Sequence, residues 1–298
     1  MKPARLGAIV AAFFGALAIG LPLSAQPSLD GADEPPPRIE VRGANVHAAA
    51  RLVAAVHGVG AWVVAPRGPA LRVVLEGDAA HAFDALARRS GLSVEAARDI
   101  QGPVFLLGDP IRLARYRNAS LRGLSGGRRI DLDHELVDVR ELTRALGAAS
   151  HMAVRSDLTG YVTVYRREAR STRAIEHLAR LADARVSSGR HAISMSLGEL
   201  PVEVPRYRAC PPGPSGALSC ADADELTLVG LAPGWALIAA PDTRAALLRA
   251  GERVGRAGAC AVSIGEDGVR LRDGLAQDAC AAAADERDPE GDRVLTFR

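Results

Sequence analysis

The sequence predicts an α+β fold with two tandem βαββα modules, followed by a small all-β domain with a meander or barrel-like arrangement. Three observations carry this prediction. In residues 129–186, apolar positions recur at strand period and helical period in the order strand, helix, strand, strand, helix. The same order occurs roughly 90 residues earlier. Beyond residue 225, short apolar runs alternate with turn residues, which is typical of hairpins.

The composition limits the classes of function. The 298 residues are 48% hydrophobic but only 4% aromatic, which allows two or three domains with small, alanine-rich cores. The formal charge is +2, and Lys2 is the only lysine, so the other basic residues are arginines spread among Asp and Glu. This distribution argues against a nucleic-acid-binding stripe. We expect no cofactor, metal or small-molecule substrate.

The N-terminus is typical of a secretory signal. Lys2 and Arg5 precede an apolar run over residues 6–23, and the small residues 24–25 favour cleavage after residue 25. The run is also long enough to remain as an uncleaved membrane anchor. No cysteine stands directly after the run, so we expect no lipoprotein anchor. Residues 26–37, acidic and rich in proline, are predicted to be a flexible tether.

Residues 38–109 form the first predicted module. Asn45 is expected to cap a helix that ends at Gly58 or Gly60. Its helices should cover only one face or edge of a short sheet, so an outer strand would keep unpaired backbone groups and offer a docking edge. The other predicted elements are strands over residues 61–65, 71–76 and 104–107, and a helix from Asp78 to Gly91.

Residues 110–128, rich in arginine and glycine, are predicted to link the modules. Gly123 to Gly127 fit the Gly-x-Ser-x-Gly pattern of serine hydrolases. That chemistry requires a strand before the motif and a helix after it, whereas a strand is predicted after it here. A flexible linker is therefore the favoured interpretation.

Residues 129–196 form the second predicted module, with a turn at residues 157–160 and Ser171 as the cap of its second helix. The pair His134-Glu135 resembles the start of a zincin motif. The second histidine is missing and the pair lies at a strand end, so we expect no metal site. The segments that match between the modules are residues 38–41 with 129–132, 45–46 with 138–139, and 82–88 with 174–180.

Residues 197–224 are predicted to be a proline-rich linker, and residues 225–298 a β domain. Turn sequences at residues 232–234 and 266–268 favour hairpins, so a small meander, closed or nearly closed, is the simplest architecture. The predicted strands are residues 226–230, 235–240, 245–248, 259–264, 269–273 and 294–297.

All four cysteines, Cys210, Cys220, Cys260 and Cys280, follow the second module. Their spacing is too irregular for a zinc ribbon, and an exported protein favours disulfides. Three pairings are open. We prefer Cys210 with Cys220 and Cys260 with Cys280, because the members of each pair are nearest in sequence; free catalytic thiols are the alternative.

The βαββα segments resemble the short periplasmic N-terminal domain of secretins, especially that of the type IV pilus secretin (PilQ-type). The resemblance rests on Arg129-Ile130-Asp131-Leu132, on Asp138-Val139 and on Gly160-Tyr161-Val162-Thr163-Val164. The short domain of TonB-dependent receptors (STN domain) shares this plan. The chain lacks the long pore domain of secretins within its 298 residues, so it is not expected to form the pore itself.

The C-terminal segment resembles the pilus-assembly PilP family and the homologous region of the type II secretion C protein. The residues that carry this resemblance are 225–230, 235–238, 251–255 and 264–271. Those families are periplasmic β domains that bind the N-terminal domains of a secretin.

Both resemblances imply a non-enzymatic periplasmic connector in a type IV pilus or type II secretion-like envelope machine. It would bind secretin or alignment-complex modules and touch a membrane only through partners or an uncleaved anchor. The expected partner-binding side chains are Val162, Val164, Leu228, Val229 and Trp235.

Two other classes stay open. One is a TonB-receptor-like signalling or transport accessory that binds an inner-membrane regulator. The other is an exported hydrolase, but the sequence shows no convincing set of converging polar residues.

Overall fold

The computed structural model describes residues 36–99, 101–118, 127–189, 192–196, 198, 200, 207, 208, 210, 213, 216–275, 277–283 and 292–297. The predicted signal segment, most of the tether and most of the Gly-x-Ser-x-Gly motif lie outside these residues. Among the helices that are described, none is both long and apolar enough to span a bilayer.

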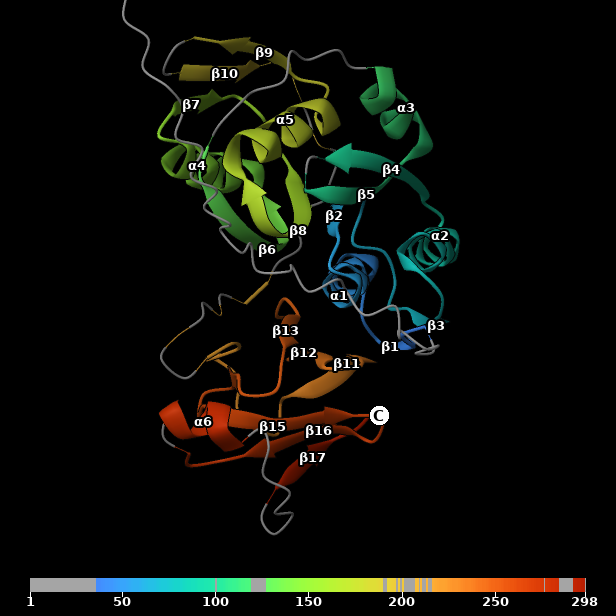
Figure 1. The fold of residues 1–298 in the computed structure, drawn as a ribbon, viewed down its shortest axis with the longest axis vertical. Coiled ribbons are helices and arrows are strands. Elements are labelled where there is room, and N and C mark those ends of the chain that lie inside the picture. The colour runs from blue at the N-terminus through green and yellow to red at the C-terminus, as the bar shows by residue number, and fades with distance from the viewer. Residues whose placement is uncertain are drawn as a thin grey trace, which may run out of the picture. The chain divides into compact units, whose positions relative to one another are not determined.

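The fold is α+β, as the sequence predicts (Figure 1). The first segment contains β1 (Ile39–Arg42), α1 (Val46–His57), β2 (Gly60–Val64), β3 (Arg72–Leu75), α2 (Ala79–Ser90), β4 (Ser93–Asp99), β5 (Gly102–Gly108) and α3 (Pro110–Asn118). The second contains β6 (Arg129–Asp138), α4 (Val139–Ser150), β7 (Ala153–Ser156), β8 (Tyr161–Arg170), α5 (Ser171–Leu181), β9 (Arg185–Ser188) and β10 (Ala192–Ser196).

The order from β1 to β5 recurs from β6 to β10, and so does the strand pairing. In the first segment β1 pairs with β3, and β2, β5 and β4 are adjacent in that order. In the second segment β6 pairs with β8, and β7, β10 and β9 are adjacent in that order. The parallel pair β2–β5 starts with Gly60 opposite Val104, and β7–β10 starts with Ala153 opposite Ala192.

The helix ends also correspond. After α1, Gly58 adopts the left-handed conformation with φ 64°, and after α4 His151 does so with φ 54°. The residue after each of these donates its backbone amide to a carbonyl five residues earlier in the helix: Val59 donates to Ala54, and Met152 donates to Gly147. This is the hydrogen bond of a helix that ends at a left-handed residue.

His151 occupies a conformation that glycine adopts at no steric cost. We therefore expect His151→Gly to raise the free energy of unfolding by about 0.5 to 1 kcal/mol. The left-handed conformation costs a non-glycine residue about 1 to 2 kcal/mol. Glycine avoids this cost, but its greater freedom in the unfolded chain offsets part of the gain. Urea denaturation of the two proteins measures this. The reciprocal control is Gly58→His, where a Cβ meets nothing within 4 Å, so a loss of similar size isolates the backbone effect.

The C-terminal segment is mainly strands. It contains β11 (Thr227–Ala232), β12 (Trp235–Ala239), β13 (Ala246–Leu248), β14 (Arg253–Val254), β15 (Ala259–Gly265), β16 (Gly268–Arg272), α6 (Gln277–Ala283) and β17 (Arg293–Leu295). Strands β11 to β13 belong to one sheet, and β14 to β17 form a second sheet. Apolar side chains such as Leu228, Ile238, Val269 and Leu271 fill the space between these sheets.

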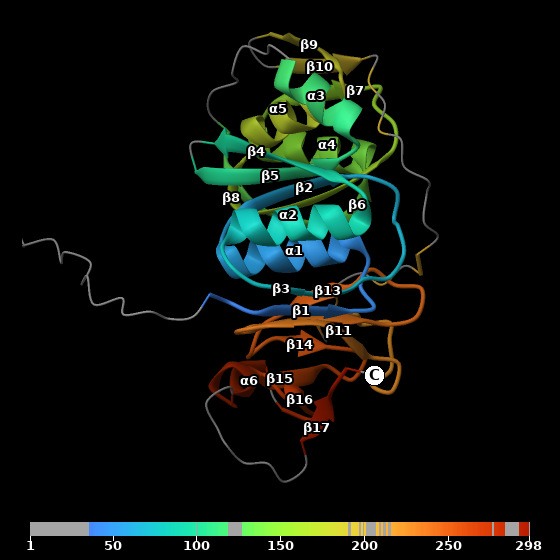
Figure 2. The same ribbon diagram turned by 90° about the vertical axis from the view of Figure 1, so that its right-hand side faces the viewer.

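From the β7-β10-β9 sheet to the β13-β12-β11-β1-β3 sheet, layers of strands alternate with layers of helices, and the β14–β17 sheet packs on the last of these (Figure 2). One core contains side chains of β1, β3, β11 and β12 together with those of α1, α2, β2 and β5. A second contains the opposite faces of β2 and β5 with α3, α4, α5 and β10. Helices α1 and α2 are therefore packed between two sheets, and the β4-β5-β2-β8-β6 sheet has helices on both of its faces.

Several local expectations were wrong. Part of the predicted 110–128 linker is the helix α3, which Asp109 caps by accepting the amide of Ile111 at 2.9 Å. Strand β4, the short strand β14 and helix α6 were not foreseen. Ser171 is the first residue of α5 rather than its cap; the cap position is Arg170, without a side-chain cap bond.

Candidate functional site: strand joints and a buried polar cluster

The three segments are joined by strand pairing. Strand β8 of the second segment pairs antiparallel with β2 of the first, which makes one five-stranded sheet in the order β4-β5-β2-β8-β6. Strand β11 of the C-terminal segment pairs antiparallel with β1, which makes another in the order β13-β12-β11-β1-β3. Each joint adds main-chain hydrogen bonds to apolar packing, as in β-strand addition between proteins.

At the first joint, Trp62 of β2 lies opposite Val164 of β8. Both side chains are buried in the same core as Val162. The Trp62 ring lies 6.0 Å from the ring of His177 on α5, measured between centroids. A large aromatic side chain at the centre of the joint provides much of its apolar burial.

At the second joint, β11 approaches α1 closely. A Cβ on Gly230 would lie 2.8 Å from Cδ2 of Leu52, so a side chain at this position would push α1 away. Val229 and Trp235 pack in the same core as Leu52, whereas Leu228 faces the second sheet. The guanidinium of Arg249 lies over the face of the Trp235 ring, 4.0 Å from its centroid, in a cation–π contact.

All five predicted partner-binding residues are thus buried within this chain: Val162 0%, Val164 0%, Leu228 1%, Val229 7% and Trp235 8% exposed. Four of these side chains belong to the cores at the two joints, and Leu228 packs between the C-terminal sheets. Their contact with a separate partner stays a prediction, and it would require a joint to open.

A buried polar cluster lies where the three segments meet. Arg51 of α1 donates to Asp133 of β6 at 2.6 Å, to Glu135 at 3.2 Å and to the carbonyl of Ala245 at 2.8 Å. The Arg51 and Glu135 side chains are 5% and 1% exposed. Ion pairs as buried as this fix the geometry of their elements, because leaving either charge unpaired is costly.

Glu135 of β6 accepts hydrogen bonds from residues both before and after the second segment. Besides Arg51, its carboxylate accepts from the Asn45 amide at 3.0 Å, from the Tyr207 hydroxyl at 3.2 Å and from the backbone of Ala245 at 3.1 Å. Burial raises the pKa of the Tyr207 hydroxyl, and the Glu135 charge raises it further. A carboxylate with its lone pairs occupied in this way is a structural group rather than a general base.

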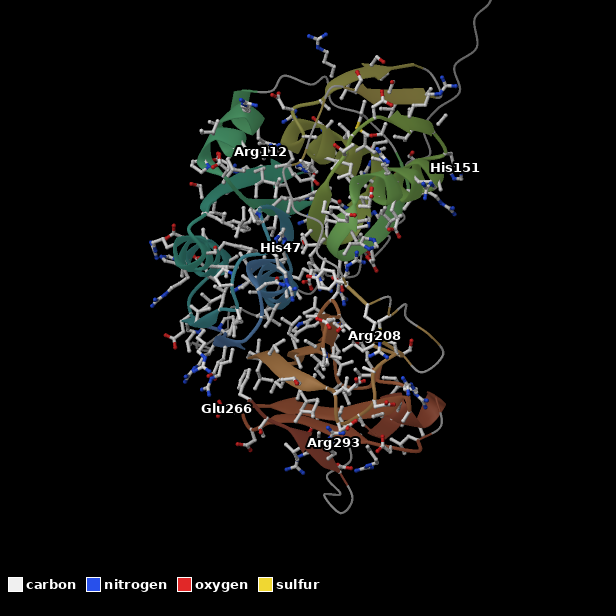
Figure 3. All side chains as sticks on the ribbon, turned by 180° about the vertical axis from the view of Figure 1, so that it is seen from behind. His47, Arg112, His151, Arg208, Glu266 and Arg293 are labelled. Atoms are coloured by element: carbon white, nitrogen blue, oxygen red, sulfur yellow. A yellow bond between two sulfur atoms is a disulfide. The ribbon has the colours of Figure 1, made fainter. Side chains whose placement is uncertain are left out.

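His47, labelled in Figure 3, is completely buried beside this cluster. Its Nδ1 lies 2.9 Å from the Thr163 hydroxyl, and its Nε2 lies 3.1 Å from the carbonyl of Ala65. A carbonyl only accepts, so Nε2 carries the proton and Nδ1 accepts from Thr163. The Thr163 oxygen in turn accepts the amide of Leu136 at 2.8 Å. Burial lowers the pKa of His47, which stays neutral near pH 7.

Glu135 of the sequence motif His134-Glu135 therefore belongs to this cluster. Within the described residues, no group of three His, Cys, Asp or Glu side chains is arranged to hold a metal ion. Arg51 was not predicted from the sequence, although a single arginine in a helix of mostly apolar residues was the available signal.

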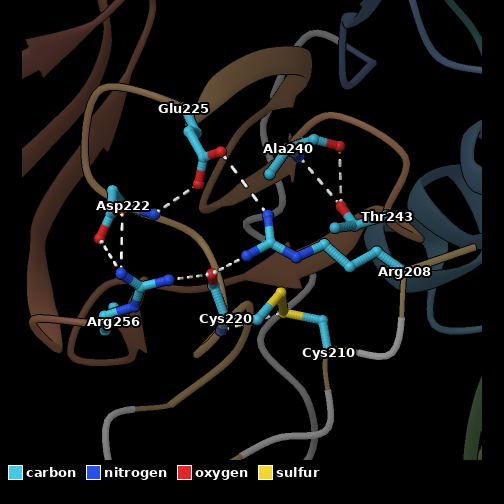
Figure 4. The surroundings of a disulfide bond; sticks show 8 residues. All are labelled: Arg208, Cys210, Cys220, Asp222, Glu225, Ala240, Thr243 and Arg256. Atoms are coloured by element: carbon cyan, nitrogen blue, oxygen red, sulfur yellow. Dashed lines mark hydrogen bonds and ion pairs between the residues drawn. A yellow bond between two sulfur atoms is a disulfide. The ribbon is translucent and has the colours of Figure 1, made fainter.

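The cysteines pair as preferred from the sequence, Cys210 with Cys220 and Cys260 with Cys280. Figure 4 shows the first bond, where the guanidiniums of Arg208 and Arg256 both donate to the Cys220 carbonyl at 2.9 Å. These contacts tie the 207–225 region to the β14–β15 turn. The second pair is buried against Val262.

We expect each disulfide to contribute about 3 kcal/mol to the C-terminal segment by the chain-entropy relation. The double replacement Cys260→Ala with Cys280→Ala removes the longer cross-link without placing a hydroxyl in an apolar site. Its free energy of unfolding, measured by urea denaturation, should be lower by that amount than that of the oxidised protein. Wild-type protein in excess dithiothreitol is the comparison, and an unchanged midpoint in both would contradict the expectation.

Comparisons with protein-family models, with curated proteins and with solved structures found no match to this chain.

Proposed function

We propose that this protein is a non-enzymatic connector in a cell-envelope assembly of the type IV pilus or type II secretion kind, and that it binds secretin or alignment-complex modules. In this proposal, residues 38–109 and 129–196 are two copies of one secretin-type module, and residues 225–298 are a PilP-like β domain. The recurring element order and strand register of the first two segments support the duplication.

The observation that carries the proposal is the pairing of β11 with β1. The families that the C-terminal segment resembles bind the N-terminal domains of secretins. In this chain the β domain binds the adjacent secretin-like segment through a strand edge, with Leu231 opposite Glu40 and Gly230 opposite Val41. The chain thus joins within one molecule the two kinds of domain that the resembled families bring together between molecules.

The proposed mechanism is binding through rigid modules. Strand addition supplies main-chain hydrogen bonds, and side chains beside the strand supply specificity. A secretin is a symmetric ring, so many weak contacts made by several copies would add to a high avidity. The two disulfides suit an oxidising compartment and support the proposed export to the periplasm.

The test is cross-linking and affinity purification of the intact, tagged protein from envelope extracts. Separate fragments are unsuitable baits, because cutting between the segments would uncover β1, β2, β8 and β11 and create adhesive edges. We expect a secretin or an alignment-complex protein to be enriched over a mock purification without bait, and to be recovered equally by a bait that carries the surface substitution Ile111→Ser. Recovery of an inner-membrane regulator instead, or of neither class, would contradict the connector role.

A further inference from the structure

We propose that the groove between β3 and α2 is a docking site for the edge strand of a sheet from another protein's βαββα module. That strand would carry a large apolar side chain at its centre and acidic residues at its ends. This inference rests on the proposed connector function and deepens it, because it says which surface takes the partner and by what chemistry.

The groove corresponds to a place that is filled in the second segment. Strand β3 and helix α2 occupy the positions in the first segment that β8 and α5 occupy in the second. Beside β8 and α5 lies β2, whose Trp62 packs near His177. The internal joint therefore shows what such a groove binds: the edge strand of a three-stranded sheet, paired antiparallel.

The outer edge of β3 has the geometry for a new strand. Leu71 directs both its N–H and its C=O toward β1, at 2.8 Å from the carbonyl of Ala44 and the amide of Gly43. The pattern alternates along a strand, so Arg72 and Val74 direct their N–H and C=O groups away from β1. The β1–β3 register runs without a bulge from Arg72 to Leu75, so the edge is straight.

The side chains beside this edge leave room. The groove has a volume of about 820 Å³ and is lined by β1, β3 and the exposed side of α2. Leu71 and Leu75 pack in the core with α2, and Val73 packs against it; Val74 lies on the other face of the strand and is 43% exposed. Counting from the helix starts, Ala85 of α2 stands where α5 has His177, so the groove is wider at the point where Trp62 packs in the internal joint.

The rim of the groove is basic. Arg42, Arg72, Arg88 and Arg89 line it together with a single acidic residue, Glu40. Arg42 pairs with Glu40, and Arg88 with Asp84 on its own helix. At the internal joint, Asp99 at the end of β4 lines a pocket with Arg173 and Arg180 of α5. An acidic residue of the β4-β5-β2 strands therefore lies in the same pocket as two arginines of α5, which also pair with Glu176. Acidic residues on a partner would suit the arginine-lined β3 groove in the same way.

A second copy of this chain fits poorly. Its equivalent edge strand is β7, and the residue in the position of Trp62, four after the left-handed helix end, is Arg155. Arg155 would enter a groove already lined by arginines. The outer side of the β7-β10-β9 sheet also exposes Ala153, Arg185 and Ser194 rather than apolar side chains, which is typical of a terminal repeat. The observations therefore favour a different protein as the partner.

The probe is a fluorescein-labelled cyclic hairpin whose outer strand is Asp-Gly-Ala-Trp-Val-Val-Ala-Glu, the β2 sequence with an acid at each end. Cyclisation limits the ordering entropy of the strand. Binding to the intact protein is measured by fluorescence anisotropy, and protection of the 72–75 amides by hydrogen exchange. We expect saturable binding, and binding at least tenfold weaker for a hairpin in which arginine replaces the tryptophan.

Two variants test the site. Val74→Pro removes an outward N–H that has no partner in the sheet, and proline is tolerated at such edge positions. Ala85→Arg places a large side chain in the groove and leaves the backbone hydrogen-bonding groups of β3 unchanged. Each should weaken hairpin binding at least tenfold, whereas Arg144→Glu, on the exposed side of α4, should not. Circular dichroism and urea denaturation verify that the variants fold.

Failure of the hairpin to bind, or equal binding by wild type and Ala85→Arg, would overturn the site. So would concentration-dependent self-association in sedimentation that Val74→Pro abolishes, since the occupant would then be a second copy. These outcomes can be told apart from a failure of the connector role. If the hairpin binds the groove but the protein recovers no envelope partner, the proposed function is wrong and the binding site is still supported.

Discussion

Replacing Arg51 by alanine is expected to lower the free energy of unfolding by about 3 to 5 kcal/mol, because Glu135 then keeps a buried charge without its cationic partner. The loss should exceed that of an ordinary surface substitution many times, since Arg51 also binds Asp133 and the Ala245 carbonyl. Equilibrium urea denaturation measures it, and a reduced cooperativity would show that the C-terminal segment separates from the first.

The matched control is Arg129→Ala. Its pair with Glu168 has a similar distance, 2.9 Å, but both side chains are more than half exposed, so the change should stay within about 0.5 kcal/mol. A second comparison is the double variant Arg51→Met with Glu135→Leu. Replacing both charges with apolar groups removes the unpaired carboxylate, so this protein should be more stable than Arg51→Ala alone. If the double variant is less stable than Arg51→Ala, the ion pairs and hydrogen bonds of the cluster stabilise the protein by more than the cost of burying these polar groups.

Acidification is expected to destabilise the protein through His177. Its Nδ1 lies 2.7 Å from the Tyr116 hydroxyl, between α5 and α3. Burial lowers the pKa of His177 to about 4, against the weaker opposing effect of Asp99 and Glu176. The folded pKa lies below the unfolded value of about 6.5, so the unfolded state binds the proton first. Stability is therefore full above about pH 6.5, falls as the pH is lowered to about 4, and levels off below that.

The size of this effect is about 3 kcal/mol between pH 7 and pH 4, from a pKa difference of roughly 2.5. His177→Gln should make the free energy of unfolding less dependent on pH between about pH 4 and 6.5, by the slope that corresponds to the uptake of one proton on unfolding. His151→Asn, at an exposed position that tolerates asparagine, should leave the slope as in wild type. Burial also lowers the pKa of His47, so part of the slope will remain. A variant curve that runs parallel to that of the wild type would exclude His177 as the source.

Much of the candidate site lay beyond sequence reasoning. The sequence predicts docking through strand edges, and the structure joins its segments by strand pairing. The expected residues Leu228, Val229 and Trp235 were chosen for apolar character, and apolar residues at strand period are the ones that a chain buries against itself. The sequence does not single out the exposed Val74, because it stands in a continuous apolar run, Val73 to Leu75, which by itself is typical of a strand buried on both faces.

The sequence by itself determined the local elements and their recurrence, because caps such as Asn45 and Asp78 and the glycines after α1 and α2 act within a few residues. It also indicated the cysteine pairs. Only the tertiary structure decided that β8 completes the sheet of β2, that β11 completes the sheet of β1, and that Arg51 meets Glu135 between three segments. Strand pairing between distant segments depends on matching two edges in space, and the backbone groups that form it are the same in every residue.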